Sequence, residues 1–365
     1  MKLGFGLLLI LHGTMHLIGF VKAFYFNAEN KQALGISKSA GLLWLLVFIL
    51  FIALASLFFY DKKWFYLAFV TVCISQILIL TVWNDAKFGT LINAIIILVS
   101  ISAYGNHHFN NKVTKEKTAL YKNITINNTK VVGKNDLLPL PEIVQKWMEN
   151  SGVLDKQNTV SLRLKQIGQM RTKPHSKWMP FSAEQYFNLS NPAFVWVTKV
   201  RFLPIINMVG RDKLTNGKGE MLIKLASLIP VVNERDNHKI NSGTMQRFLS
   251  EMCWFPSAAL NHYITWEFID SSSAKATLTI KKHSVSGIFK FNTKGDLLAF
   301  ETNRYYGGSK DAKQEKWVVK IIDYKNFDGY RIPYKCKVVW QLQDGDFNWL
   351  NLEITDLEYN ITEPY

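Results

Sequence analysis

Two histidines lie within a long apolar stretch, where ionisable side chains are rare. His12 and His16 are four residues apart, so on a helix they share one face. At about 1.5 Å per residue, His16 lies roughly 20 Å from the entry side and so nearer the far face, where the turn at Asp85 and the first turns of the segment that contains Asn93 also lie. These four residues are a candidate intramembrane polar cluster. Such a cluster can hold a proton, a small ligand or a metal ion, or it can join helices by hydrogen bonds.

A second group combines charged and aromatic side chains in the C-terminal half. Arg247 and Glu251 are four residues apart, so they can pair across one helical turn. With Arg304 they can grip a lipid headgroup at the mouth of a cavity, or form a partly exposed ion pair that contributes little. Tryptophans nearby suit a ligand cavity and a protein core equally well. The candidate ligand-binding residues are Trp196, Met221, Arg247, Glu251, Trp254 and Arg304.

The usual catalytic patterns are missing from the sequence. It has no G-x-S-x-G elbow, no phosphate-binding glycine loop, no dinucleotide fingerprint and no H-E-x-x-H pair. The cysteines Cys73, Cys253 and Cys336 are scattered in apolar surroundings, where free thiols are common. We therefore predict no catalytic residue, no metal site and no cofactor, and a non-enzymatic role is favoured.

The charged residues are unevenly distributed along the 365-residue chain. Residues 1–105 hold 7 of the 43 basic and 3 of the 28 acidic residues, which is too few for a water-soluble domain. A membrane-spanning helix needs about 20 mostly apolar residues. Four segments approach that length, and together they predict a multi-pass domain in the cell membrane. They are Leu3–Phe26, Ala40–Tyr60, Trp64–Trp83 and Gly89–Tyr104.

A basic polar linker over residues 106–136 is expected to follow the membrane domain, because Lys and Asn dominate it. Its lysines suit anionic lipid headgroups, and equally a solvated tether. The net charge of +15 raises the question of nucleic acid. No arginine-rich helix, zinc-ligand spacing or RNA-binding aromatic motif accompanies it, so we exclude nucleic acid as a partner.

Residues 137–362 predict an antiparallel β-rich domain with two or three helices. Apolar and polar residues alternate in several runs, as at Ala276, Leu278 and Ile280, which is typical of half-buried strands. A short helix is expected at Glu142–Asn150. A second is expected around Met245 and Met252, capped by Asn241, Ser242 or Thr244 and ended by Pro256.

The size of this sheet favours a hollow. About ten strands at roughly 4.8 Å spacing make a sheet near 50 Å wide. Two helices, each about 10 Å across, cover less than half of it. The sheet must therefore curl into a half-barrel or leave a concave apolar surface. An acyl chain is the kind of ligand that such a surface suits.

Several motifs in this domain resemble those of a widespread, uncharacterised bacterial membrane-protein family. The resemblance covers roughly residues 137–360 and implies no known activity. Its motifs include Trp178-Met179-Pro180-Phe181-x-Ala183-Glu184-Gln185, Gly217-x-Gly219-x-Met221 and Arg247-x-Leu249-x-Glu251-x-x-Trp254-x-Pro256-x-Ala258. The strand order also loosely resembles the half-barrel of periplasmic lipoprotein carriers (LolA-like), which bind acyl chains.

Three functions remain open at this point. The leading hypothesis is a membrane-anchored carrier or sensor whose β-rich domain binds a lipid or another apolar ligand. The others are an enzyme acting on a membrane-associated substrate, and a structural domain that binds an envelope protein partner. Membrane lipids are expected partners. The lysines of the short loops favour a cytoplasmic C-terminal domain, whereas the carrier resemblance implies a periplasmic one.

Overall fold

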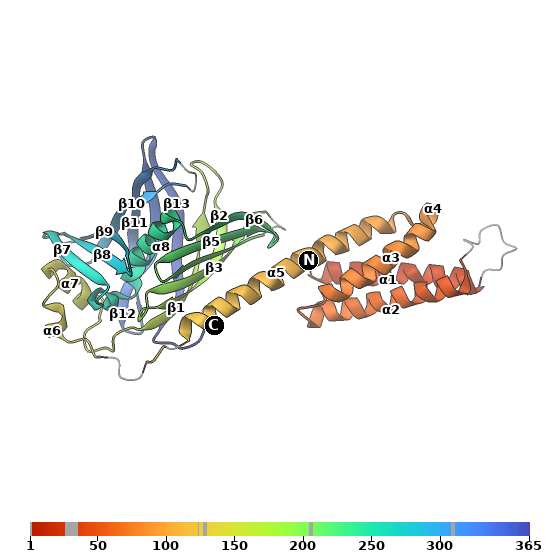
Figure 1. Ribbon diagram of the computed structural model, residues 1–365, viewed down its shortest axis with the longest axis horizontal. Helices are drawn as coiled ribbons and strands as arrows, with labels where there is room; N and C mark the ends of the chain where they lie inside the picture. The colour runs from red at the N-terminus through yellow and green to blue at the C-terminus, as the bar shows by residue number, and fades with distance from the viewer. Residues whose placement is uncertain (1, 26–35, 123, 127–129, 204–206, 308–310) are drawn as a thin grey trace. The chain divides into compact units, whose positions relative to one another are not determined.

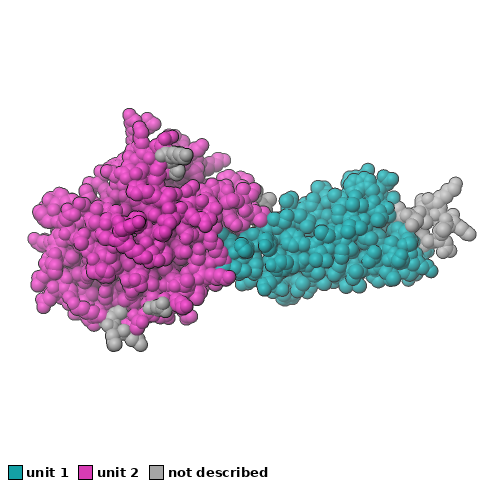
Figure 2. Space-filling view, in the orientation of Figure 1, with its two compact units in different colours: residues 1–111 teal, residues 112–365 magenta. Residues whose placement is uncertain are grey.

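The chain divides into two compact units, residues 1–111 and residues 112–365 (Figure 2). The computed structural model describes residues 2–25, 36–122, 124–126, 130–203, 207–307 and 311–365. The first unit contains helices only, and the second is built around a large sheet (Figure 1). An N-terminal helical part followed by an antiparallel sheet domain, as the sequence predicted, is therefore confirmed.

The first unit is a set of apolar helices. They are α1 (Lys2–Tyr25), α2 (Lys38–Tyr60), α3 (Phe65–Thr81), α4 (Trp83–Ala86) and the first part of α5 (Gly89–Tyr121). Three of them, α1, α2 and α5, are long and apolar enough to cross a membrane, whereas α3 is apolar but has only 17 residues. Phe26, the last residue expected in the first span, lies outside the described residues.

Close packing joins α1 to α2. A Cβ atom on Gly19 would lie 2.3 Å from the Trp44 ring, and one on Gly13 would lie 2.6 Å from the Cβ of Phe51. Only glycine permits so near an approach of the two helices. The glycines of α1 therefore define the surface on which α2 packs.

Helix α5 continues beyond the apolar segment into the stretch expected to be linker. Its last residues, from Lys112 on, belong to the second unit and pack against strand β2 (Met179–Asn188). Lys117 donates hydrogen bonds to Glu184 (2.6 Å) and to the Tyr186 hydroxyl (2.9 Å). Asn188 donates to the carbonyl of Leu120 at 2.9 Å. These contacts stabilise the end of α5 as a helix, although its sequence has no strong apolar periodicity.

A single sheet of 13 strands forms the second unit, together with α6 (Lys134–Leu137) and α7 (Glu142–Asn150). Every pairing is antiparallel, and the strand order is β6-β5-β4-β3-β2-β1-β13-β12-β11-β10-β9-β8-β7. The edge strands β6 and β7 are not paired with each other, so the sheet is open. The strands are β1 (Ser161–Met170), β2 (Met179–Asn188), β3 (Ala193–Arg201), β4 (Asn207–Thr215), β5 (Lys218–Leu225), β6 (Ile229–Arg235), β7 (Ile264–Asp270), β8 (Ser273–Ile280), β9 (His283–Phe291), β10 (Leu297–Tyr305), β11 (Gln314–Phe327), β12 (Tyr330–Leu342) and β13 (Gly345–Tyr359).

Tight turns at an Asn-Gly pair and an Asp-Gly pair join neighbouring strands. Asn216 and Gly217 have φ angles of 56° and 77°, and Asp328 and Gly329 have φ angles of 49° and 76°. A two-residue hairpin turn whose twist matches that of the flanking strands requires positive φ at both of its central residues. These turns connect β4 to β5 and β11 to β12.

Helix α8 (His238–Glu251) shows that the sheet curls. It contacts β4, β5 and β6 on one side and β8, β9 and β10 on the other, although six strands separate these groups in the sheet (Figure 1). A flat sheet could not place both groups against one helix. The short 3-10 helices η1 (Met252–Trp254) and η2 (Pro256–Leu260) then lead to β7.

The start of α8 lies one turn earlier than the sequence indicated. Asn237 is the N-cap, and its side chain accepts a hydrogen bond from the Ile240 amide. Asn241, one of the expected caps, instead accepts from the amide of Gly219 at 2.7 Å and so fastens α8 to β5. The helix ends at Glu251, before Pro256. The sequence did not indicate Asn237 as the N-cap, because the apolar residues that marked the helix, from Met245 on, begin two turns later.

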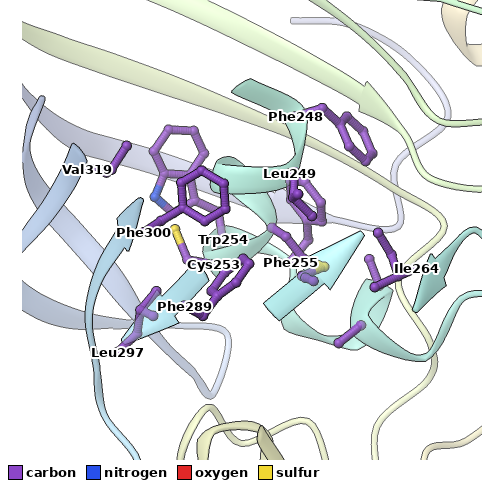
Figure 3. Close-up of a cluster of buried hydrophobic side chains, with 14 of the residues drawn as sticks. Phe248, Leu249, Cys253, Trp254, Phe255, Ile264, Phe289, Leu297, Phe300 and Val319 are labelled. Atoms are coloured by element: carbon purple, nitrogen blue, oxygen red, sulfur yellow. The ribbon is translucent and has the colours of Figure 1, made fainter. Parts of the chain in front are cut away.

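The main core lies between the α8–η1 segment and the inner face of the sheet (Figure 3). Phe248, Phe255, Phe289 and Phe300 are all buried, and Phe289 lies 4.9 Å from Phe300 between ring centroids. Aromatic pairs at this distance stabilise the fold beyond the free energy gained by burying the two rings. The core thus holds α8 firmly against the later half of the sheet.

Candidate functional site

A cavity of about 320 Å³ lies in the second unit, on the face of the sheet that α8 covers. Its walls are mainly apolar and come from strands on both sides of the β1–β13 pair, from α8 and from η1. Four methionines, Met170, Met179, Met208 and Met221, line the wall formed by β1 to β5. Unbranched thioether side chains adapt to ligands of irregular shape.

The structure brings all six predicted ligand-binding residues to this one cavity. Strand β3 supplies Trp196, β5 supplies Met221 and β10 supplies Arg304, while η1 supplies Trp254. Arg247 and Glu251 come from the last two turns of α8. They lie side by side because four residues make about one helical turn. A role for these residues in binding remains a prediction.

Arg247 is the centre of a buried ion-pair cluster. Its Nε donates to Glu251 Oε1 at 2.7 Å, its Nη1 to Asp212 Oδ2 at 2.7 Å and its Nη2 to Gln185 Oε1 at 3.3 Å. The Gln185 amide also donates to Glu251 Oε2 at 2.7 Å. Burial raises the pKa of Glu251, although Arg247 and Gln185 bind its ionised form. These groups hold one another in place, so they suit a structural wall better than proton transfer.

Asp212 and Gln185 were missed by the sequence reasoning. Asp212 lies on β4, opposite Trp196 of β3, and Gln185 lies on β2, also opposite Trp196. Both have a detectable signal. Asp212 is an acid on the inward face of a strand whose other inward positions are Met208, Gly210 and Leu214, and Gln185 ends the motif that begins at Trp178.

Arg304 differs from Arg247 in its surroundings. It is half-buried, and its guanidinium carbon lies 4.9 Å from the centroid of the Trp317 ring. It makes no hydrogen bond or ion pair with any residue that the structure describes, and Glu315, opposite it in the β10–β11 pairing, is not within ion-pair distance. Burial and the nearby Arg247 charge lower the pKa of Arg304 to about 10.

The polar residues predicted to lie within the membrane form a separate network in the first unit. His12 Nε2 lies 3.0 Å from Asn93 Oδ1, and His16 Nε2 lies 2.9 Å from Ser75 Oγ. Asn93 donates to Ser75 at 3.0 Å, which links the two histidines through α3. Asp85 is exposed on α4 and takes part in none of these hydrogen bonds. The structure thus joins three of the four predicted residues and replaces Asp85 by Ser75.

The described ranges of the chain contain neither a metal-binding cluster nor a cavity thiol of lowered pKa. Within those ranges, no group of three or more His, Cys, Asp or Glu side chains is placed to hold a metal ion. Cys253 and Cys336 both line the cavity as free thiols, and burial raises the pKa of Cys336 to about 12. A thiol of that pKa is a poor nucleophile near neutral pH.

Comparison with known proteins places the sheet domain in a family. The model of a family of unknown function, DUF6920, matches residues 138–359. The chain belongs to this family. No curated protein matches the chain significantly.

Two solved structures are distantly similar to this member of the DUF6920 family. One is a LolA superfamily protein from Nitrosomonas europaea, at 11% identity and a TM-score of 0.35, covering 60% of this chain and 92% of that one. Another is a "putative outer membrane lipoprotein-sorting protein domain" from Vibrio parahaemolyticus, at 11% identity and a TM-score of 0.36, covering 60% of this chain and 91% of that one. Scores of this size are too low to transfer a ligand or a partner to this chain.

Proposed function

We propose that this protein is anchored in the cell membrane and that its sheet domain binds a lipid or another apolar ligand, as a carrier or a sensor. The observation that carries the proposal is the apolar cavity of about 320 Å³ between α8 and the curled sheet. Cavities that bind small molecules typically measure about 300–1,000 Å³ and combine apolar walls with a few polar groups. The cavity has both properties.

The size of the cavity suits one acyl chain. A water molecule in the liquid occupies about 30 Å³, so the cavity has room for roughly ten groups of that size. A chain of about ten methylene or methyl groups is therefore of the right volume. The four methionines on the β1–β5 wall can adjust to chains of somewhat different length.

The proposal includes four membrane spans, with α3 as the shortest. At 1.5 Å per residue, its 17 residues extend about 26 Å, slightly less than the roughly 30 Å hydrocarbon layer. Buried polar atoms also support α3 as a span, because Ser75 joins Asn93 of α5 and His16 of α1 within the bundle. In this proposal the histidine network holds helices together rather than binding a ligand. A location in the envelope, with an envelope protein as partner, remains a prediction.

Photocrosslinking in membranes tests the lipid-binding proposal. Membranes that contain the full chain are incubated with a fatty acyl probe carrying a photoactivatable diazirine, and labelled peptides are mapped by mass spectrometry. We expect label on cavity residues such as Met179, Met208 and Met221. Met221→Trp fills the cavity and should reduce that label about fivefold or more. Leu298→Trp is the control, because Leu298 is 50% exposed and lies outside the cavity.

The outcome of this experiment is decisive in both directions. Label at the cavity that is lost in Met221→Trp and kept in Leu298→Trp supports the proposal. Label confined to α1–α5, or equal cavity label in both variants, contradicts it. Thermal unfolding of each variant verifies that loss of label does not reflect loss of the fold.

A further inference from the structure

Three arginines line the cavity, and their partners distinguish them. Arg211 forms ion pairs with Glu116 at 3.1 Å and Glu220 at 2.9 Å, and it is only 2% exposed. Arg247 uses all three of its guanidinium nitrogens on Glu251, Asp212 and Gln185. Arg304 alone of the three is without a hydrogen bond or ion pair among the described residues.

The carboxylates that the structure describes near Arg304 form no ion pair with it. Asp212 and Glu251 are close enough to attract it, but both are bonded to Arg247, whose own positive charge repels Arg304. Burial lowers the pKa of Arg304 to about 10, and the repulsion from Arg247 adds to this effect. The face of Trp317 offers a weak cation–π contact at 4.9 Å. The guanidinium is therefore a cation whose surroundings favour the arrival of an anion.

The location of Arg304 matches a ligand with one charged end. It lies on β10, whereas the four methionines lie on β1, β2, β4 and β5, across the β1–β13 pair. Helix α8 leaves room for the guanidinium, because a Cβ atom on Gly243 would lie 3.1 Å from Arg304 Nε. A chain that extends from Arg304 toward the methionines would place its charged end on the arginine and its tail on apolar walls.

We propose that the ligand of this cavity is an anionic amphiphile whose carboxylate or phosphate head binds the Arg304 guanidinium. This inference rests on the proposed function, because it specifies the ligand of the same cavity. Guanidinium binds both kinds of oxyanion in a bidentate manner. The two sources of such a head, a free fatty acid and a phosphate-bearing lipid, are separated by the probes below.

Competition binding with matched ten-carbon probes tests this inference. The full chain in detergent is loaded with a fluorescent apolar probe, which is displaced by decanoate, decyl phosphate or the neutral decanol. A charge-assisted hydrogen bond contributes about 1.5–3 kcal/mol, so we expect at least one of the two anions to bind about tenfold or more tightly than decanol. Preference for decanoate indicates a fatty acid, and preference for decyl phosphate indicates a phosphate-bearing lipid.

Three variants connect the preference to Arg304. Arg304→Gln should lose the preference for the anion over decanol. Arg304→Lys should retain part of the preference, because it keeps the charge without the planar fork. Arg201→Gln is the matched control, since Arg201 is exposed at the end of β3 and lies outside the cavity, and it should behave as the unmodified protein.

Failure of this inference is distinguishable from failure of the proposed function. Equal affinity of the unmodified protein for decanol and both anions overturns the role of the anion while leaving an apolar site. Loss of decanol binding in Arg304→Gln, with the same melting temperature, also overturns it, because Arg304 would then shape the cavity rather than bind the head. Probe binding that Met221→Trp does not reduce contradicts the proposed function itself.

Discussion

Removal of the Arg247 charge should strongly destabilise the second unit. In the unmodified protein, Asp212 and Glu251 each bond to Arg247 at 2.7 Å. Arg247→Met leaves both carboxylates in place without this partner. The side chains of Arg247, Asp212 and Glu251 are 16%, 15% and 9% exposed, so water compensates little for the lost cation. Breaking a buried ion pair by removing one partner costs about 3–5 kcal/mol. For a unit of this size, that loss lowers the melting temperature by roughly 6–20 °C.

A matched triple variant separates charge from packing. Asp212→Asn and Glu251→Gln, combined with Arg247→Met, remove all three charges while keeping similar volumes. Neutral replacement of a whole buried ion-pair group is often tolerated, so the triple variant should recover at least half of the lost stability. Thermal unfolding of the full chain in detergent, followed by tryptophan fluorescence, measures all three proteins. A shift below about 2 °C in Arg247→Met, or a triple variant as unstable as the single one, would refute the reasoning.

Further predictions concern the packing and chemistry of the same domain. Gly219→Ala should lower the free energy of unfolding by about 1–3 kcal/mol in chemical denaturation, because its Cβ would lie 2.4 Å from the Oγ1 of Thr244. Gly133→Ala, whose Cβ meets nothing nearer than 3.8 Å, should change it little, and equal losses would contradict the packing argument. Phe289→Ala should cost about 3–5 kcal/mol in the same measurement, because Phe289 is fully buried; a loss below about 1 kcal/mol would count against a rigid core there. Burial raises the pKa of Cys336 to about 12, so iodoacetamide at about pH 8 should modify it only after unfolding, as mass spectrometry can verify; rapid labelling of the folded protein would disprove this.

Local patterns in the sequence predicted the elements well, because they depend on neighbours along the chain. The alternation at Ala276, Leu278 and Ile280 falls within β8, and all three side chains are buried. The helix expected at Glu142–Asn150 is present with the same bounds as α7. Proline before a helix and glycine after it act within one or two turns, so they can be read from the sequence directly.

Pairings between segments that are distant in the chain could not be predicted from the sequence. Strand β1 pairs with β13, whose partner residues lie nearly 200 positions later, as for Arg163 and Glu358. Helix α5 persists to Tyr121 because its polar residues find partners on β2, and these partners are invisible in local composition. Packing of this kind overrides weak local preference.

The candidate site shows the same division between local and distant information. Arg247 and Glu251 were paired correctly from their spacing on one helix. Asp212 was not found, because it reaches Arg247 from a strand 35 residues away. Asp85 was expected to join the histidines on depth alone, and depth does not determine which way a side chain points.

The seam at the middle of the sheet bears on how the cell makes this protein. Strand β13, the last strand of the sheet in chain order, lies between β1 and β12, so no strand of one wing of the sheet pairs with a strand of the other wing until β13 is in place. A nascent chain that ends before Gly345 would expose two unpaired strand edges, which are templates for aggregation. Completion of the sheet is thus delayed until β13 has been synthesised, and removal of β13 should be far more damaging than its place as the last strand of the sheet in the chain suggests.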